Sequence, residues 1–241
     1  MSTLYTNARF WSAGQGIFHD LLVKDSIILA TGENVKEFTA ETTIDLNGAF
    51  VIPAFLDGHA HPIFAGREAA GPKINGINSI EEIKAQVKAF ALANPKIPWI
   101  IGGAYEAAII EGGDFDAKWL DEVVSDRPVV LHAVDHHTIW VNSKAIEVAG
   151  ITSATKDPQG GTIARNSDGS AKGTLREPSA MALVLNHAPA NTIESDIAAI
   201  TYACAEYRKV GVIAAIDSWC EKDMARAYIA AAKTNQLTIA F

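Results

Sequence analysis

One short stretch, "FVIPAFLDGHAHP" at residues 50–62, constrains the fold of this chain most strongly. Its apolar beginning predicts a strand at about residues 51–58, buried on both faces as the strands of parallel sheets are. Asp57, His59 and His61 stand at alternate positions, and alternate side chains of a strand point to the same side. Two imidazoles on one side of a strand can bind one divalent metal ion through nitrogen. We therefore predict that His59 and His61 are metal ligands.

The alternative for this pair is that ordinary hydrogen bonds satisfy both histidines. The position of the pair favours a metal, because active sites of α/β barrels lie at the carboxyl ends of their strands and both histidines lie at the carboxyl end of this one. Pro62 then ends the strand, since proline has no N–H to donate to a neighbouring strand. We expect Asp57 to support a ligand rather than to bind the metal itself.

The chain divides into two parts by its sequence pattern. Residues 1–52 hold short β-branched runs broken by Gly, Asn and Asp, which predict strands and turns. From residue 53 to 241, predicted strands alternate with predicted helices, as is typical of a parallel sheet with crossover helices. A stretch rich in Gly, Asp and Asn at about 152–176 predicts a hairpin insertion, with strands at Thr162–Arg165 and Gly173–Leu175. Further strands are expected at about 98–103, 128–134, 212–217 and 236–241, and helices at 79–94, 116–124, 143–150, 178–187, 192–211 and 221–235.

Composition excludes several classes of function. The formal net charge of −8 argues against a nucleic-acid surface. The two cysteines, Cys204 and Cys220, form no CxxC motif, so a disulfide framework is not expected. We therefore expect a reducing, cytoplasmic compartment. No apolar run reaches the roughly 18 to 20 residues of a membrane span, and no export signal is visible.

Two segments carry a resemblance to a known family. The opening "ILATGENV", followed by "TIDLNGAFVIPAFLDGHAHP", resembles that of the amidohydrolase superfamily, where a small β-sandwich precedes a metal-binding (β/α)8 barrel. The segments "RPVVLHAVDHHTIWVNSKAIEVAGI" and "DPQGGTIARNSDGSAKGTLREPSA" are similar to the branch that includes N-substituted formamide deformylase. The resemblance implies an α/β fold, with β-sandwich strands at residues 1–52 and part of a TIM barrel at 53–241.

The resemblance also assigns roles to single residues. It implies that Glu177, at the end of "GTLRE", is a carboxylate ligand of the metal, whereas the residues alone favour a surface ion pair, the more common role of a carboxylate between Arg176 and Pro178. It places His137 and Tyr105 against the substrate; the alternative for His137 is a hydrogen-bonded histidine between a strand and a helix. The superfamily usually has Asp-Gly-His where this chain has Asp135-His136-His137.

Other polar residues receive plainer interpretations. We expect His136 to face solvent or to have a structural role, and His132, inside an apolar strand, to be a hydrogen-bonded core residue. Asp217 ends the strand expected at 212–217 and points to the same end of the barrel, with no role assigned. No residue is identified as the catalytic acid or base.

These observations predict an enzyme that uses a divalent metal, most simply zinc, to activate water for hydrolysis of a C–N bond in a small amide-type substrate. The family's later histidines and aspartate have no matching segment, so the chain resembles the N-terminal half of a longer protein. The alternative is an inactive half-barrel or interaction module that needs a complementing chain. We expect a homo-oligomer or such a complement, and no amide hydrolysis by this chain alone. A nucleobase deaminase of the same superfamily fits the later segments less well.

Overall fold

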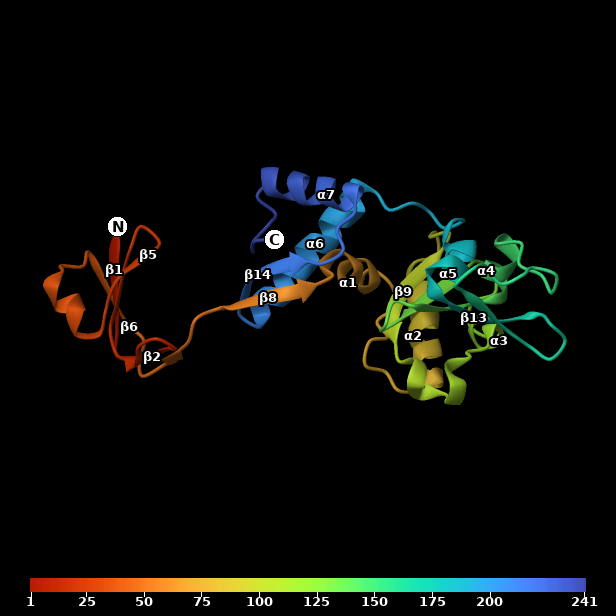
Figure 1. Ribbon diagram of the computed structural model, residues 1–241, viewed down its shortest axis with the longest axis horizontal. Helices are drawn as coiled ribbons and strands as arrows, with labels where there is room; N and C mark the ends of the chain where they lie inside the picture. The colour runs from red at the N-terminus through yellow and green to blue at the C-terminus, as the bar shows by residue number, and fades with distance from the viewer. The chain divides into compact units, whose positions relative to one another are not determined.

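The computed structural model describes residues 1–241 and has the mixed α/β composition that the sequence predicts. The chain forms two compact units, shown with the whole chain in Figure 1. The first unit comprises Met1–Leu56 and Gly211–Ala214, and the second comprises Asp57–Val210 and Ala215–Phe241. The residues predicted to carry chemistry all belong to the second unit.

The first unit is built from short strands in two sheets. In the four-stranded sheet, of order β5-β4-β1-β6, β1 pairs antiparallel with β4 and parallel with β6. In the three-stranded sheet, of order β3-β2-β7, β2 pairs antiparallel with β3 and parallel with β7. Asn7 and Asn47 have positive φ angles of 55° and 50°, a conformation that asparagine tolerates in turns. The elements are β1 (Ser2–Thr6), β2 (Arg9–Ser12), β3 (Gly16–Phe18), β4 (Leu21–Lys24), β5 (Ile27–Thr31), the 3-10 helix η1 (Gly32–Glu37), β6 (Thr42–Asp45) and β7 (Phe50–Val51).

The second unit contains a five-stranded sheet of order β12-β13-β11-β10-β9, in which only β9 and β10 are parallel. Successive strand residues face opposite sides. Leu131 accordingly packs with α2 residues such as Ile83, and Val130 packs with α5 residues such as Val184. Both faces of this sheet are therefore covered. The strands are β9 (Ile100–Tyr105), β10 (Val129–Ala133), β11 (Thr138–Val141), β12 (Thr162–Arg165) and β13 (Ala171–Arg176).

The helices around this sheet begin where the sequence predicts. In α2 (Ile80–Ala93), the Ser79 hydroxyl accepts a hydrogen bond from the Glu82 amide at 3.4 Å, as an N-cap does. The Asn142 side chain caps α4 by accepting from the Ala145 amide at 3.0 Å. The expected helix at 116–124 is shorter. The other elements here are η2 (Ala107–Ile109), η3 (Glu111–Gly113), α3 (Ala117–Asp121), α4 (Ser143–Val148) and α5 (Glu177–Leu185).

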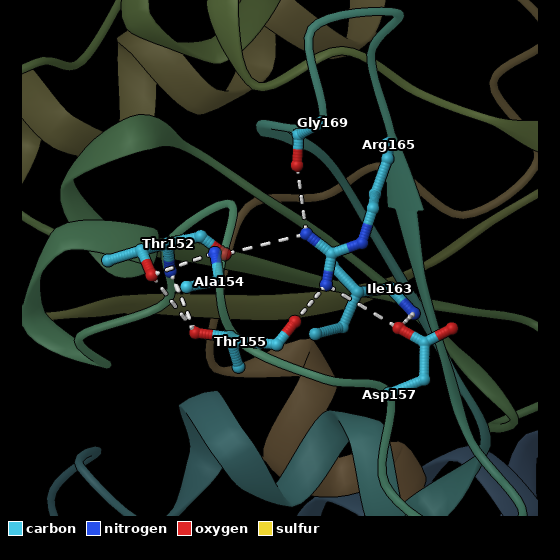
Figure 2. A network of polar contacts seen from close by, with 7 residues as sticks. All are labelled: Thr152, Ala154, Thr155, Asp157, Ile163, Arg165 and Gly169. Atoms are coloured by element: carbon cyan, nitrogen blue, oxygen red, sulfur yellow. Dashed lines mark hydrogen bonds and ion pairs between the residues drawn. The ribbon is translucent and has the colours of Figure 1, made fainter.

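The predicted hairpin is present, and one arginine ties it to the loop before it. β12 and β13 pair antiparallel. The Arg165 guanidinium donates to the carbonyl oxygens of Gly169 at 2.9 Å, Thr152 at 3.4 Å and Thr155, and it lies 3.6 Å from the Asp157 carboxylate (Figure 2). These contacts give the loop a fixed shape without a hydrophobic core of its own.

The strands β8 (Phe55–Ala60) and β14 (Val212–Asp217) form a separate two-stranded sheet. The Phe55 amide donates to Gly211 and the Ser218 amide to Ala60, both at 2.9 Å, so residue numbers rise together along the two strands and the pair is parallel. The expected strands at 51–58, 98–103, 128–134 and 212–217 therefore form two sheets here instead of one.

Two expectations about strands are wrong. β8 is not buried on both faces: Phe55 and Leu56 are 53% and 72% exposed, because β8 pairs with β14 alone. The strand expected at 236–241 is absent, since the tail makes a single bridge, in which the Ala215 amide donates to the Ala240 carbonyl at 3.0 Å. A single backbone hydrogen bond does not make a β-strand, which needs several successive paired residues.

Three further helices pack against one another, α1 (Pro62–Ala69) against α6 (Ile193–Lys209) and α6 against α7 (Lys222–Lys233), and α1 also contacts β9. Their shared core contains Ile63, Ile200, Cys204, Met224 and Ala227. The helix α1 was not predicted from the sequence, because Pro62 was interpreted only as the end of a strand. Proline also suits the first position of a helix, where its missing N–H would have no partner. No helix in the structure has both the length and the apolar character needed to cross a membrane.

Candidate metal centre

His59 and His61 lie at the carboxyl end of β8, and their ring centroids are 5.3 Å apart. Asp57 does not point a free carboxylate at them. Its Oδ1 accepts from the His59 amide at 3.1 Å, and its Oδ2 accepts from the Tyr207 hydroxyl at 3.1 Å. Burial and this hydrogen bond raise the pKa of Tyr207 to about 12, so the hydroxyl keeps its proton and holds Asp57 in place.

The imidazole of His61 is not satisfied by the protein. Its Nδ1 is buried and has no hydrogen-bond partner, and the nearest carboxylate oxygen, Oδ1 of Asp217, is 4.0 Å away. Asp217 is itself fixed, because it accepts from the Tyr228 hydroxyl at 2.8 Å and from the Trp219 amide at 3.1 Å. A buried ring nitrogen without a partner is costly unless a ligand satisfies it.

The two histidines open onto a cavity of about 970 Å³. Asp57, Glu68, Lys73 and Asn75 also line it, together with apolar residues of α1 and α6. A cavity of this size accommodates a small molecule. The donor set of two imidazoles beside an open cavity fits a divalent metal ion with room left for a substrate.

A second group of polar side chains lies next to this pair. The ligand atoms of Glu68, His132 and His136 all lie within 4.8 Å of one another, and Glu68 Oε1 is 3.5 Å from His136 Nδ1. Burial raises the pKa of Glu68 to about 7. Burial, with a smaller contribution from the charge on His136, lowers the pKa of His132 to about 4. Burial also lowers the pKa of His136, followed by the effect of His61.

The backbone of β9 makes room for this group. Leu131 pairs with Gly102 and Ala133 with Tyr105, so the single residue between them on β10, His132, faces two residues of β9. Such a bulge changes the direction of nearby side chains. Gly103 lies within the bulge, and a Cβ atom there would stand 2.5 Å from Cδ of Glu68. The Glu68 carboxylate thus occupies space that only glycine leaves free.

His136 adopts a backbone conformation that glycine favours. Its φ angle is 58°, in the left-handed region, which costs a residue with a Cβ roughly 1–2 kcal/mol. The Asp-Gly-His pattern of the superfamily has glycine at this position, as stated above. The histidine here therefore carries a strain that glycine would avoid, and strain of this kind is common at functional sites.

Sheet pairing brings together His137 and Glu177, which lie forty residues apart in the sequence. β11 pairs with β13, so His137, just before β11, lies beside Glu177, just after β13. Their side chains meet at 3.0 Å, and the hydrogen bond to Glu177 raises the pKa of His137. No ion pair joins Glu177 to His59 or His61. Its role as a metal ligand stays a prediction.

Tyr105 lies in the core and not among the residues that line the cavity beside His59. Its ring is fully buried against Phe115 and Trp140, with centroids 4.7 and 5.9 Å away. Burial raises the pKa of its hydroxyl, which has no hydrogen-bond partner. Contact between Tyr105 and a substrate stays a prediction without support from this position.

The sequence analysis missed the Glu68 group. It expected His132 to be hydrogen-bonded, yet the structure gives this side chain no hydrogen bond, and it expected His136 to have no ligand role. One signal was available: the resemblance implies a glycine where this chain has His136, and a histidine in a place suited to glycine needs a reason. Glu68 gave no signal, because the eight residues of α1 are too few for a clear helical period.

Comparisons with known proteins identify a family and a similar fold. The model of the amidohydrolase family matches residues 42–241. The putative amidohydrolase YtcJ of Bacillus subtilis (strain 168) is 36% identical over 173 residues, which cover 69% of this chain and 32% of YtcJ. N-substituted formamide deformylase of Arthrobacter pascens is 28% identical over 140 residues, which cover 57% of this chain and 26% of the deformylase.

Among solved structures, an uncharacterized metal-dependent hydrolase from Pyrococcus horikoshii OT3 superposes with a TM-score of 0.69 at 20% identity. The superposition covers 100% of this chain and 48% of the Pyrococcus chain. At this identity the likeness concerns the fold alone. The chain spans about half the length, or less, of the relatives that it matches.

Proposed function

The chain belongs to the amidohydrolase family, as predicted, and on this premise we propose that it contributes the metal-binding side of an enzyme that hydrolyses the C–N bond of an amide-type small molecule. Membership supports hydrolase chemistry in general. The substrate, the activity of the whole protein and its partners are part of the proposal.

One observation carries the proposal: His61 has a buried Nδ1 without a hydrogen-bond partner, next to His59 and on the wall of the cavity. The alternative for the pair required hydrogen bonds that satisfy both rings. Imidazole nitrogen suits zinc among the common divalent ions, so we propose zinc at His59 and His61, with Glu177 as a further ligand. A zinc ion at such a site polarises a carbonyl group and lowers the pKa of water.

Residues around the pair have supporting roles in this proposal. Asp217 Oδ1 is 4.0 Å from His61 Nδ1, so this carboxylate lies beside the ring nitrogen that lacks a partner. Tyr228 keeps Asp217 in place, and Tyr207 does the same for Asp57 beneath His59. His137 is proposed to contact the substrate.

The proposal also includes the fold of each part of the chain. We propose that residues 53–241 form part of a (β/α)8 barrel with the hairpin at about 152–176 as an insertion, and that residues 1–52 supply strands of a β-sandwich. The exposed apolar side chains of β8 support a further strand beside it, from a second copy or a complementing chain. Family membership favours a hydrolase over an inactive remnant or interaction module.

The test incubates the full-length protein, loaded with Zn²⁺, with a panel of N-formyl and N-acyl amines and measures the release of free amine. We expect release of free amine that a chelator abolishes and that added Zn²⁺ restores. The double variant His59→Ala/His61→Ala should lose at least a hundredfold in amine release.

The matched control is His187→Asn, because His187 is exposed and outside the cavity. It should keep the parent's rate. The proposal is wrong if no amide in the panel is cleaved, if the chelator has no effect, or if the double variant keeps the parent's rate.

A further inference from the structure

We propose that Glu68, His132 and His136 form a second site for a divalent transition-metal ion, separate from His59 and His61. The proposal concerns ion binding by these three side chains and holds whether or not the protein hydrolyses amides.

The geometry of the group is close to that of a metal site. Ligand atoms around a tetrahedral zinc ion, with bonds of about 2.0–2.1 Å, lie roughly 3.4 Å apart. Glu68 Oε1 and His136 Nδ1 already have this spacing, at 3.5 Å. All three ligand atoms lie within 4.8 Å of one another. The spacing thus differs little from that of a bound site.

The protein itself leaves the group unsatisfied. Oε1 of Glu68 is buried without a hydrogen-bond partner, and Nδ1 of His136 is 3.5 Å from it. A buried carboxylate oxygen without a hydrogen-bond partner is costly unless something binds to it. A metal ion would satisfy all three together.

The surrounding backbone is built to hold the group. The bulge in β9 faces His132, and Gly103 within it leaves the space that the Glu68 carboxylate fills. His136 keeps a left-handed φ of 58° to present its ring from the turn after β10. Three separate elements, α1, β9 and the β10 turn, therefore meet at this point.

This site is distinct from the first pair. The ring of Phe64 lies near both His61 and His136, with centroids 6.0 Å and 5.8 Å apart. The cavity that His59 and His61 line includes Glu68 but neither His132 nor His136. The two sites are neighbours in one region, and the proposal gives each its own ion.

The ligand set indicates the kind of ion. Two imidazoles and one carboxylate, with a position left open, are typical of zinc in hydrolytic enzymes. Magnesium prefers six oxygen ligands and is not expected to bind here. The probe is therefore Zn²⁺ alone, with Mg²⁺ as the negative comparison.

The experiment uses the metal-free chain of 241 residues and its variants. Isothermal titration calorimetry measures the affinity for Zn²⁺, and elemental analysis measures the number of ions bound per chain. We expect two ions per parent chain. Glu68→Gln and His136→Gly should each lower the affinity for one of the two ions at least tenfold. The double variant His59→Ala/His61→Ala should still bind that ion and should lose the other. His136→Gly also removes the strain of a left-handed residue with a Cβ. If the thermal unfolding midpoint of this variant is equal to or higher than the parent's, the loss of the ion is not caused by misfolding.

Gly103→Ala provides a test that removes no ligand. The added Cβ would displace the flexible end of Glu68 and should weaken the same ion by about tenfold, while His187→Asn should leave both ions unchanged. The proposal is overturned if the Glu68, His136 and Gly103 variants bind Zn²⁺ like the parent, or if His59→Ala/His61→Ala removes all zinc. If only the ion at Glu68 is found, this site stands and the proposed function loses its metal at His59 and His61.

Discussion

The amide of Glu177 donates a hydrogen bond to the carbonyl of His137 at 2.7 Å, and the two side chains meet at 3.0 Å. Both side chains are more than half exposed, so their ion pair is expected to add little to stability. We predict that Glu177→Gln leaves the thermal unfolding midpoint almost unchanged but lowers metal-dependent amine release at least tenfold. Glu147→Gln, which removes another exposed ion pair, with Lys144, should change neither. Equal amine release from Glu177→Gln and the parent would remove Glu177 from the proposed site.

Glu177 also has a positive φ angle, 69°, which suits glycine. We predict that Glu177→Gly raises the free energy of unfolding by about 1 kcal/mol, because the strain of a left-handed residue with a Cβ is relieved. The same change at Glu147, within α4, should lower it by about 1 kcal/mol, because glycine is a poor helix former. Urea denaturation measures both. A loss of stability in Glu177→Gly would mean that its side chain contributes more than its backbone costs.

Arg67 and Asp196 join α1 to α6 through two parallel hydrogen bonds of 2.7 and 2.9 Å. The Asp196 side chain is 4% exposed, so removing the arginine leaves a buried charge without a partner. We predict that Arg67→Met lowers the free energy of unfolding by about 3–5 kcal/mol. Arg226→Met breaks an exposed pair with Asp223 and should cost less than about 1 kcal/mol. Similar losses in the two variants would contradict this account of how α1 is held.

Gly66 in α1 allows the same two helices to approach closely. A Cβ at this position would clash with the backbone of Ala199 in α6, which cannot move aside as a side chain can. We predict that Gly66→Ala lowers the free energy of unfolding by at least about 1–3 kcal/mol, as other overpacked positions do. Gly14→Ala is the control, because nothing lies within 4 Å of its Cβ position. The prediction fails if both alanine variants unfold at the parent's urea concentration.

Exposed apolar side chains on β8 and β14 predict self-association. Leu56 is 72% exposed and Ile216 is 61% exposed, and unpaired strands with apolar faces are sites of association. We predict that Leu56→Gln/Ile216→Thr lowers the apparent mass of the chain in light scattering. Leu92→Gln removes an equally exposed side chain, at 73%, from the helix α2 and should not. A parent chain that is monomeric at all concentrations would contradict the prediction.

Local sequence patterns predicted much of this fold. Ser79 with Glu82 marked the start of α2, and the Gly-rich stretch around Asp168 marked the β12–β13 hairpin, because caps and turns depend on neighbouring residues. The exposure of β8 could not be predicted. An apolar run indicates that a strand is buried, but it does not show whether the neighbouring strands that would bury it are present. The final segment, Leu237–Phe241, likewise reads as a strand and has too few partners to form one.

The candidate sites were predictable in part. His59 and His61 are two residues apart on one strand, so strand geometry alone brings them together. Glu68, His132 and His136 meet only because α1 packs beside β9, which pairs with β10, and no local pattern fixes such packing. A polar residue in the place of a glycine, as at His136, is the one sign of that site that the sequence offers.

The most direct test of the account is a zinc-edge anomalous difference map from crystals of the protein soaked in Zn²⁺. We predict a peak within bonding distance, about 2.0–2.1 Å, of one nitrogen of His59 and one of His61. A second peak among Glu68, His132 and His136 would support the further site. The account is contradicted if the map shows no peak at His59 and His61, and their ring nitrogens are instead hydrogen-bonded to the protein.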